Sequence, residues 1–504
     1  MRLPLSTTRC FAGAAFLQHE CIGRCRSVAG KLRQMLTFHA GSSGQMRCDG
    51  VTRRSFLKAG ALGVGGLTLA DLLRAEAASG LGGSHKAIIN IHLDGGPPQM
   101  DLIDPKPQAP PEVRGAFGPI PTSVPGFHVT ELMPKMASIA DKAVFIRSLV
   151  GAEGKHDAFQ CMSGFSDKNL QGLGGRPAMG CVVNKLLGTP DDQVPAFVDL
   201  MQGRPLARNS ARPGFLGPAF NPFRPDISHL FHRELEEGMK VELAKLGANH
   251  QTPLSLVEGL PVGRLDDRLT LLAALDQLPR SLDSVGNMQA SDQFTQQAYS
   301  ILTSGKISAA MDLDREDPRV VERFTPRVSD QLASYTSEGP QAALKLLLAR
   351  RLVEAGVRCV TVSISDFDTH QKNADRMRLL GPVIDHALHA LIVDLDERGM
   401  LDDVTIVAWG EFGRTPKINA NGGRDHWPKV AMGIMAGGGM PGGQVIGATD
   451  KNAAEAISRP IHYQDVIATL YKKLGIDALA VTLEDPSGRP QYLVDRGRPI
   501  AELA

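Results

Sequence analysis

The feature that most constrains the fold is a helix-to-strand unit that occurs twice in succession. The helix-period segment "QAALKLLLARRLVEAG" leads into the apolar run "RCVTVSI", and "LGPVIDHALHALIVDLDERGM" leads into "VTIVAWGEFG". Amphipathic helices followed after short turns by apolar runs are typical of parallel strands buried between helices. The pattern therefore predicts an α/β protein with a mostly parallel sheet flanked by helices.

Other apolar runs extend this sheet on both sides of the repeated unit. Residues 88–93, in "HKAIINIHLDGG", form a nearly continuous apolar run bounded by glycines, and "AVFIRSL", "AFVDLM" and "VAMGIMAGGG" are similar. The segment "HYQDVIATLYKKLGID" predicts a late helix that ends at a glycine. We expect one large α/β domain over residues 79–504, because roughly 425 residues suit a single domain with insertions.

Residues from about 225 to 339 have a different character. The segments "LFHRELEEGMKVELAKL", "RLDDRLTLLAALDQL" and "SDQFTQQAYSILTSG" have helical periodicity and polar faces, with no strand-like run between them. We interpret this stretch as a helical insertion into the α/β domain. A separate helical domain is the alternative.

An export signal is predicted near the N-terminus. Arg53 and Arg54 precede a moderately apolar run at 59–70, and small residues of the A-x-A type follow at 75–78. The run is about a dozen residues long, whereas a bilayer span needs about 20, so we expect no stable membrane span. Paired arginines are typical of the twin-arginine route. We therefore assign residues 35–78 to a twin-arginine signal region and expect a periplasmic or secreted protein that engages the twin-arginine export machinery.

The position of this signal is unusual, because residues 1–52 precede the paired arginines. Export signals ordinarily begin within the first few residues. Met35 would place the signal near a start, so we expect residues 1–34 to be a misassigned N-terminal extension. The alternative for the signal itself is an amphipathic helix with no role in export.

Charge and cysteine content exclude several classes of function. Lys+Arg 55 against Asp+Glu 54 gives a net charge of +1, and no basic tract suggests nucleic acid or an anionic membrane as a partner. Four of the seven cysteines precede residue 49, and the others are Cys161, Cys181 and Cys359. Their scattered positions favour neither a disulfide framework nor a thiolate metal site.

Acidic and imidazole side chains follow three of the predicted strands and precede a fourth. Because ligands bind at the carboxyl ends of parallel strands, these side chains are expected to converge on one edge of the sheet. The candidates are Asp94, Asp366, Asp368, His370, Glu411 and His426.

Such a gathering of carboxylates predicts a bound cation, since buried like charges repel and an unpaired carboxylate is costly to desolvate. Carboxylate and imidazole ligands suit divalent ions such as Zn, Mn, Mg, Ca or Fe. Two ions about 3.5–4 Å apart would bind the attacking and the leaving oxygen in the transfer of a phosphoryl or sulfuryl group. The alternatives are a turn residue at Asp94, a loop hydrogen bond between Asp368 and His370, and a packed core histidine at His426.

The motifs that carry these residues resemble a known family. "LDGGPPQMDLIDPKP", "DTHQ", "WGEFGRTP" and "GRDHWP", behind a twin-arginine leader, are similar to domain-of-unknown-function family 1501 (DUF1501). Those exported bacterial proteins belong to the alkaline phosphatase and sulfatase superfamily. The resemblance implies an alkaline-phosphatase-like sandwich with one or two metal ions.

The resemblance also implies a division of ligands between two ions. Asp94 and Glu411 would hold one ion. Asp368, His370 and His426 would hold the other.

Two further residues receive catalytic roles from the resemblance. Arg414 would grip a substrate oxyanion, because its planar fork suits such groups; the alternative is a salt bridge that positions Glu411. The superfamily expects a Ser, Thr or modified Cys nucleophile near "SLVGAEGKHDAFQCMSGF", but the Cys/Ser-x-Pro/Ala-x-Arg string of sulfatases is missing from the sequence. His156 occupies that place and would be a nucleophile, a general acid or a third-shell ligand.

These features predict an exported metal-dependent hydrolase, phosphatase-like or sulfatase-like, acting on a small-molecule or polysaccharide ester of phosphate or sulfate. The alternative is a non-catalytic protein that binds metal and anions on the same fold. An isomerase that moves a phosphate would need a phosphorylatable residue, which the motifs do not identify.

Overall fold

The computed structural model describes residues 86–503 except for 171, 190, 202–210, 231–299, 302 and 327–340. The predicted N-terminal extension and the twin-arginine signal region lie outside the described residues. Most of the predicted helical insertion at 225–339 lies outside them as well.

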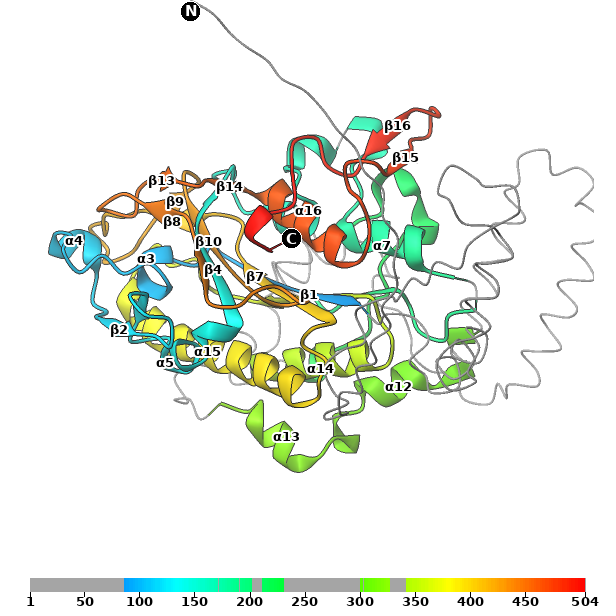
Figure 1. Cartoon of the computed structure of the whole chain (residues 1–504), viewed down its shortest axis with the longest axis horizontal. Helices are drawn as coiled ribbons and strands as arrows, with labels where there is room; N and C mark the ends of the chain where they lie inside the picture. The colour runs from blue at the N-terminus through cyan, green and yellow to red at the C-terminus, as the bar shows by residue number, and fades with distance from the viewer. Residues whose placement is uncertain are drawn as a thin grey trace, which may run out of the picture. The chain divides into compact units, whose positions relative to one another are not determined.

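A mixed, mostly parallel sheet forms the centre of the described domain (Figure 1). Its strands are β1 (Ala87–Leu93), β4 (Ala143–Val150), β5 (Phe197–Asp199), β6 (Cys359–Ile364), β7 (Val404–Trp409), β10 (Ala431–Gly437), β11 (Gln444–Ile446) and β14 (Ile461–His462). They follow the order β11-β4-β10-β7-β1-β6-β5, with β14 paired to β4. Strand β10 runs antiparallel to β4 and β7, and the other pairings are parallel.

Helices cover both faces of this sheet (Figure 1). One face packs against α5 (Pro134–Ser138), α14 (Ala342–Glu354) and α15 (Asn373–Glu397), and the other packs against α6 (Phe159–Ser163), α7 (Met179–Leu187) and α16 (Tyr463–Lys473). Successive strand side chains alternate between the two cores: Ile89 and Ile91 join the first and Ile88 joins the second. The predicted α/β class, with a mostly parallel sheet between helical layers, is confirmed.

Short helices, 3-10 turns and two-stranded ladders connect the main elements. The short α-helices are α3 (Gln99–Leu102), α4 (Pro111–Arg114), α12 (Lys306–Met311) and α13 (Pro318–Arg323). The 3-10 turns are η2 (Ala140–Lys142), η3 (Asp167–Leu170), η4 (Gly172–Gly174), η5 (Gly214–Leu216), η6 (Pro218–Phe220), η7 (Ser228–Leu230), η9 (Leu313–Arg315) and η12 (Ala501–Leu503). Two-stranded ladders pair β2 (Pro119–Pro121) with β3 (His128–Thr130), β8 (Gly413–Arg414) with β9 (His426–Trp427), β12 (Ala448–Thr449) with β13 (Ala456–Ser458), and β15 (Thr482–Glu484) with β16 (Pro490–Tyr492).

Helix α15 begins earlier than its hydrophobic pattern indicates. The periodic segment starts at Leu380, but the helix begins at Asn373 and continues through Pro382. Proline interrupts helices by removing a backbone donor, yet buried Met377 packs in the core on the N-terminal side. Gly381 lets the helix approach Leu132 closely, since a Cβ at this position would lie 2.9 Å from the Leu132 Cβ.

The described part of the predicted insertion is helical and is tied to α14 by arginines. Arg351 donates to the carbonyl oxygens of Ala309 and Ala310 at the end of α12, at 2.6 and 2.8 Å. Arg351 also donates to Glu316 at 2.7 Å, and Arg350 pairs with the same carboxylate. The boundaries of the insertion stay a prediction.

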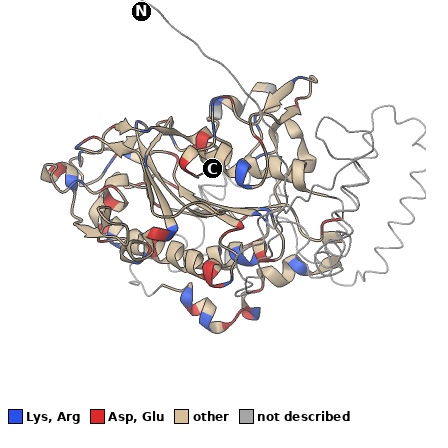
Figure 2. Cartoon of the chain, viewed as in Figure 1, with Lys and Arg blue, Asp and Glu red and all other residues tan. Residues whose placement is uncertain are grey.

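Lys and Arg are interspersed with Asp and Glu over the described elements (Figure 2). None of the helices in this part of the chain is both long enough and apolar enough to cross a bilayer.

A carboxylate from α15 caps α5, which has no capping side chain of its own. Asp385 accepts hydrogen bonds from the backbone N–H groups of Lys135, at 3.0 Å, and Met136, at 2.8 Å. We expect Asp385→Ala to lower the free energy of unfolding by about 1–2 kcal/mol, because two helix N–H groups lose their acceptor. Asp385→Asn keeps one acceptor and should lose less.

Urea denaturation measures both variants. Burial raises the pKa of Asp385, and the hydrogen bonds from the backbone N–H groups lower it by less, so its pKa is about 6. The buffer is therefore set well above pH 6, where Asp385 is a carboxylate. Wild-type stability in the alanine variant would contradict the capping role.

Candidate metal centre

Three adjacent parallel strands bring the predicted acids to one edge of the sheet. Strand β1 lies between β6 and β7, with Leu93 beside Ile364 and His92 beside Trp409. The loops that follow these strands therefore start at the same carboxyl edge, as the fold class predicts. Those loops carry Asp94, Asp368 and Glu411.

The antiparallel direction of β10 explains how a residue that precedes a strand joins this edge. Residues before β10 lie beside the residues that follow β7, because the two strands run in opposite directions. The β8–β9 ladder then pairs Arg414 with His426. His156 comes from the loop between β4 and α6, which starts at the same edge.

The inner group consists of His92, Asp94 and Glu411, which are 0%, 6% and 1% exposed. His92 Nε2 lies 3.6 Å from Asp94 Oδ1 and 3.6 Å from Glu411 Oε2. The backbone N–H of Gly95 donates to Glu411 Oε1 at 3.0 Å. Among the described residues, Glu411 Oε2 and both ring nitrogens of His92 have no hydrogen-bond partner. The three ligand atoms could therefore hold a metal ion.

The charges of the inner group depend on one another. Burial alone would raise the pKa of Glu411. The His156 hydrogen bond and the charges of His92 and His156 lower it by more, so the pKa lies below its ordinary value. Burial lowers the pKa of His92, but Asp94 and Glu411 raise it by more. Glu411 is therefore a carboxylate, which can only accept hydrogen bonds or bind cations.

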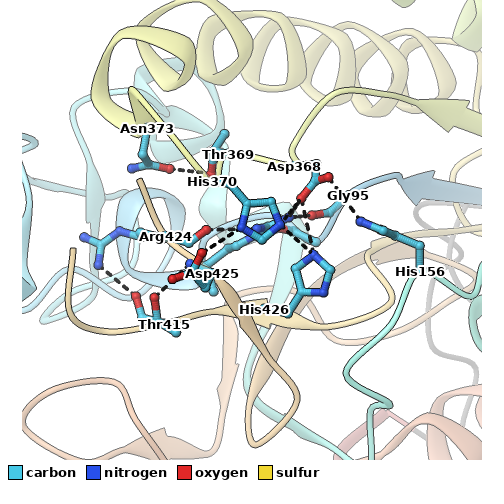
Figure 3. A network of polar contacts seen from close by, with 12 residues as sticks. Gly95, His156, Asp368, Thr369, His370, Asn373, Thr415, Arg424, Asp425 and His426 are labelled. Carbon is cyan, nitrogen blue, oxygen red and sulfur yellow. Dashed lines mark hydrogen bonds and ion pairs between the residues drawn. The ribbon is translucent and has the colours of Figure 1, made fainter. Parts of the chain in front are cut away.

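The outer group consists of Asp368, His370 and His426, and it is more open to solvent. The exposed side-chain fractions are 30%, 46% and 22%. Asp368 Oδ1 lies 3.1 Å from His370 Nε2 and 3.4 Å from His426 Nε2, and the two imidazole nitrogens are 3.1 Å apart. Figure 3 shows both rings turned toward Asp368.

The second nitrogen of each outer ring is held by an acceptor. His370 Nδ1 lies 2.7 Å from Asp425 Oδ1, and His426 Nδ1 lies 3.0 Å from the carbonyl oxygen of Gly154. Both partners are acceptors, so each Nδ1 donates to its partner and the Nε2 of each ring faces Asp368. Two imidazole Nε2 atoms and one Asp368 oxygen thus lie 3.1–3.4 Å from one another. This arrangement fits a divalent cation, since metal-ligating histidines typically donate their other N–H to a carboxylate or carbonyl.

Arg414 fixes one oxygen of Asp368. Its Nη2 donates to Asp368 Oδ1 at 2.6 Å and to the carbonyl oxygen of Gly95. Its Nε donates to the carbonyl oxygen of Gly96 at 3.1 Å, and its Nη1 donates to the carbonyl oxygen of Arg424 at 2.9 Å. The guanidinium is buried. Burial raises the pKa of Asp368, but hydrogen bonds from His156, His426 and Arg414 lower it well below its usual range.

His156 connects the two groups. Its Nδ1 lies 2.8 Å from Glu411 Oε1. Its Nε2 lies 3.2 Å from Asp368 Oδ2, as Figure 3 shows. Burial lowers the pKa of His156, but these two carboxylates raise it to about 9. His156, Asp368 and His426 also form a group whose ligand atoms lie within 4.8 Å of one another, so His156 could join the outer ligands.

The Gly-Gly pair after Asp94 is required by close approach of the three loops. Gly95 has φ +103°, and a Cβ there would lie 2.4 Å from the backbone nitrogen of Asp368. Gly96 has φ +74°, and its Cβ would lie 2.4 Å from the Phe412 ring. Side chains at either position would push the candidate ligands apart.

The structure thus brings together Asp94, Glu411, Asp368, His370, His426, His156 and Arg414. Their roles as ligands or catalytic residues stay predictions. Two polar residues of the centre were missed as candidates from the sequence, His92 and Asp425. His92 precedes Asp94 by two positions, the spacing that places both on one face of a strand. Spacing alone does not distinguish a packed histidine from a ligand, so His92 was passed over.

A buried ion pair anchors the loop that carries Asp425 and His426. Arg424 Nε and Nη2 donate to the two carboxylate oxygens of Asp101 at 2.9 and 3.1 Å, and both residues are fully buried. We expect Asp101→Ala to lower the free energy of unfolding by about 3–5 kcal/mol, because it leaves a buried guanidinium without the carboxylate that balances its charge.

The matched control is Asp375→Ala, which removes an exposed pair with Arg378. It should change stability by less than about 0.5 kcal/mol. Chemical denaturation of both variants measures the difference, and equal losses would show that the buried pair does not anchor the loop.

Residues 85–504 match the family model described as "Protein of unknown function (DUF1501)". No curated protein matches the chain. Two solved structures are similar: the PsFucS1 sulfatase from Pseudoalteromonas sp. (TM-score 0.34, 13% identity, 81% of this chain and 70% of that chain) and the phosphonate monoester hydrolase SpPMH from Silicibacter pomeroyi (TM-score 0.28, 12% identity, 77% and 73%). Likeness at these TM-scores says nothing of what this chain does. Because the family match covers most of the chain, the protein belongs to the DUF1501 family, as its motifs predicted.

Proposed function

We propose that this protein is an exported, metal-dependent hydrolase of phosphate or sulfate esters. The outer group carries the proposal: two imidazole Nε2 atoms and the Asp368 carboxylate meet at a partly exposed position, where a substrate could reach a bound cation. Imidazole and carboxylate ligands together suit a divalent ion such as Zn or Mn.

The chain offers ligands for two ions. Asp368, His370 and His426 would hold the outer ion, and Asp94 and Glu411 would hold the inner ion. When bound, these ions would stabilise the negative charge that develops on the oxygens of a transferring phosphoryl or sulfuryl group.

We assign Arg414 the role of positioning Asp368. Its guanidinium nitrogens donate to Asp368 and to three backbone carbonyls, so gripping a substrate oxyanion would require it to leave these acceptors. Asp425 positions His370 in the same way by holding its Nδ1. Fixed ligands let a site bind its cation without reorganisation.

We assign His156 the role of holding Glu411 and Asp368 at their present separation. Each of its ring nitrogens faces a carboxylate oxygen, so this arrangement offers no lone pair to attack a substrate. Figure 3 shows the ring edge turned toward Asp368.

The second candidate function is a non-catalytic protein that binds a metal and an anion. It is favoured by the environment of Cys161, the cysteine in the segment where the superfamily places its nucleophile. Cys161 is fully buried, and burial raises the pKa of its thiol well above its ordinary value. A thiol of this kind is a poor nucleophile.

Asp368→Ala tests the hydrolase proposal. We expect wild-type protein to contain metal and to hydrolyse an aryl phosphate or an aryl sulfate. The variant should lose the outer ion and at least about 100-fold in activity, because the removed carboxylate is a direct ligand. Elemental analysis by mass spectrometry and release of the aryl alcohol are the measurements.

Asp375→Ala is the control, since it removes an exposed carboxylate from the first turn of the helix that follows this loop. It should keep both metal and activity. Stoichiometric metal in wild-type protein with every ester inert would exclude the hydrolase and support the binding protein.

The export route is tested by replacing Arg53 and Arg54 together with lysine. We expect the precursor to accumulate in the cytoplasm and the processed form to disappear from the periplasm, because the route is selected by the paired arginines. Immunoblots of cell fractions measure the change. Arg47→Lys is the control and should leave export unchanged, whereas export of the double variant would rule out the twin-arginine route.

A further inference from the structure

His92 is a buried histidine in an apolar strand. It is 0% exposed, and its neighbours Ile91 and Leu93 belong to the hydrophobic core. Neither of its ring nitrogens has a hydrogen-bond partner among the described residues. Leaving a buried polar group unsatisfied costs about 1–3 kcal/mol, so this position is unfavourable for histidine unless another group completes its bonding.

The register of the sheet aims His92 at two carboxylates. Asp94 directly follows β1, and its backbone N–H continues the ladder by donating to Ile364 at 2.9 Å, so His92 and Asp94, two residues apart, lie on one side of the extended chain. His92 is level with Trp409, the last residue of β7, and Glu411 follows Trp409 by two positions. The Gly95 N–H and His156 both bind Glu411 Oε1, which leaves Oε2 to face His92.

The distances in this group suit a metal ion better than a proton. His92 Nε2 is 3.6 Å from each facing carboxylate oxygen. An N–H···O hydrogen bond spans about 2.7–3.2 Å, so neither contact is one. Ligand atoms that surround an ion tetrahedrally, with bonds of about 2.0–2.2 Å, lie about 3.3–3.6 Å from one another.

We propose that His92, Asp94 and Glu411 bind one transition-metal ion of the Zn²⁺ type, with the imidazole as the deciding ligand. The inference deepens the proposed function and rests on it, since it gives the inner ion a third ligand and a chemical class. Imidazole nitrogen favours Zn²⁺ and similar ions, whereas Ca²⁺ takes six to eight oxygen ligands and Mg²⁺ keeps several waters. A group this deeply buried has little room for such waters.

His92→Leu tests the third ligand, because leucine fills the apolar position and cannot bind metal. Full-length protein is stripped with a chelator, reloaded with ZnCl₂, and analysed for bound zinc per chain. We expect two equivalents in wild-type protein and one in the variant. Full retention of zinc in His92→Leu would overturn the inference.

Asn90→Ala is the matched control for folding. Asn90 lies on the same strand and the same face, and its buried side chain donates to the Cys161 carbonyl oxygen and accepts from Trp409. The control should lose thermal stability while it keeps both zinc equivalents. Loss of zinc in this control would show that zinc loss follows destabilisation, and it would also overturn the inference.

His92→Gln tests selectivity, since it replaces the nitrogen ligand with an oxygen ligand. The ratio of Zn²⁺ to Ca²⁺ affinity, measured by competition, should fall by about 10-fold or more. An unchanged ratio would overturn the inference. Asp368→Ala separates the two proposals. If Asp368→Ala loses zinc while both His92 variants keep all of theirs, only the role of His92 as an inner ligand is rejected. If wild-type protein binds no zinc, the proposed function is rejected as well.

Discussion

The meeting of three carboxylates at one edge of the sheet is the constraint on which the rest of the site depends. Asp94, Asp368 and Glu411 come from loops after β1, β6 and β7, and these strands are neighbours. Their mutual repulsion in a partly buried place must be offset by positive groups. Arg414 supplies one of these to Asp368, and His156 lies between Asp368 and Glu411.

This balance divides the site into two environments. The inner group is almost without solvent access, and its carboxylates face a histidine at a distance too long for a hydrogen bond. The outer group is partly open, and its two imidazole rings are oriented by acceptors on their far sides. A buried group suits a permanently bound ion, whereas an open group suits contact with a substrate.

The supporting interactions are spread over distant parts of the chain. The Asp101–Arg424 pair joins helix α3 to the loop before β9, more than three hundred residues later in the sequence. Gly95 and Gly96 allow the β1 loop to touch the backbone of Asp368 and the ring of Phe412. Substitutions far from the ligands are therefore expected to act on the site through the positions of its loops.

The sequence by itself determined the fold class and part of the candidate site. Alternating helical and apolar segments specify a parallel sheet, and the carboxyl ends of its strands identify Asp94, Asp368, His370 and Glu411 from local pattern alone. Only the tertiary structure decided the strand order, the antiparallel direction of β10 that brings His426 to the edge, and the burial of Arg414 against Asp368. His92 was hidden for the same reason. An isolated polar residue in an apolar run has no local signal that distinguishes packing from binding, because its partners are chosen by long-range strand register.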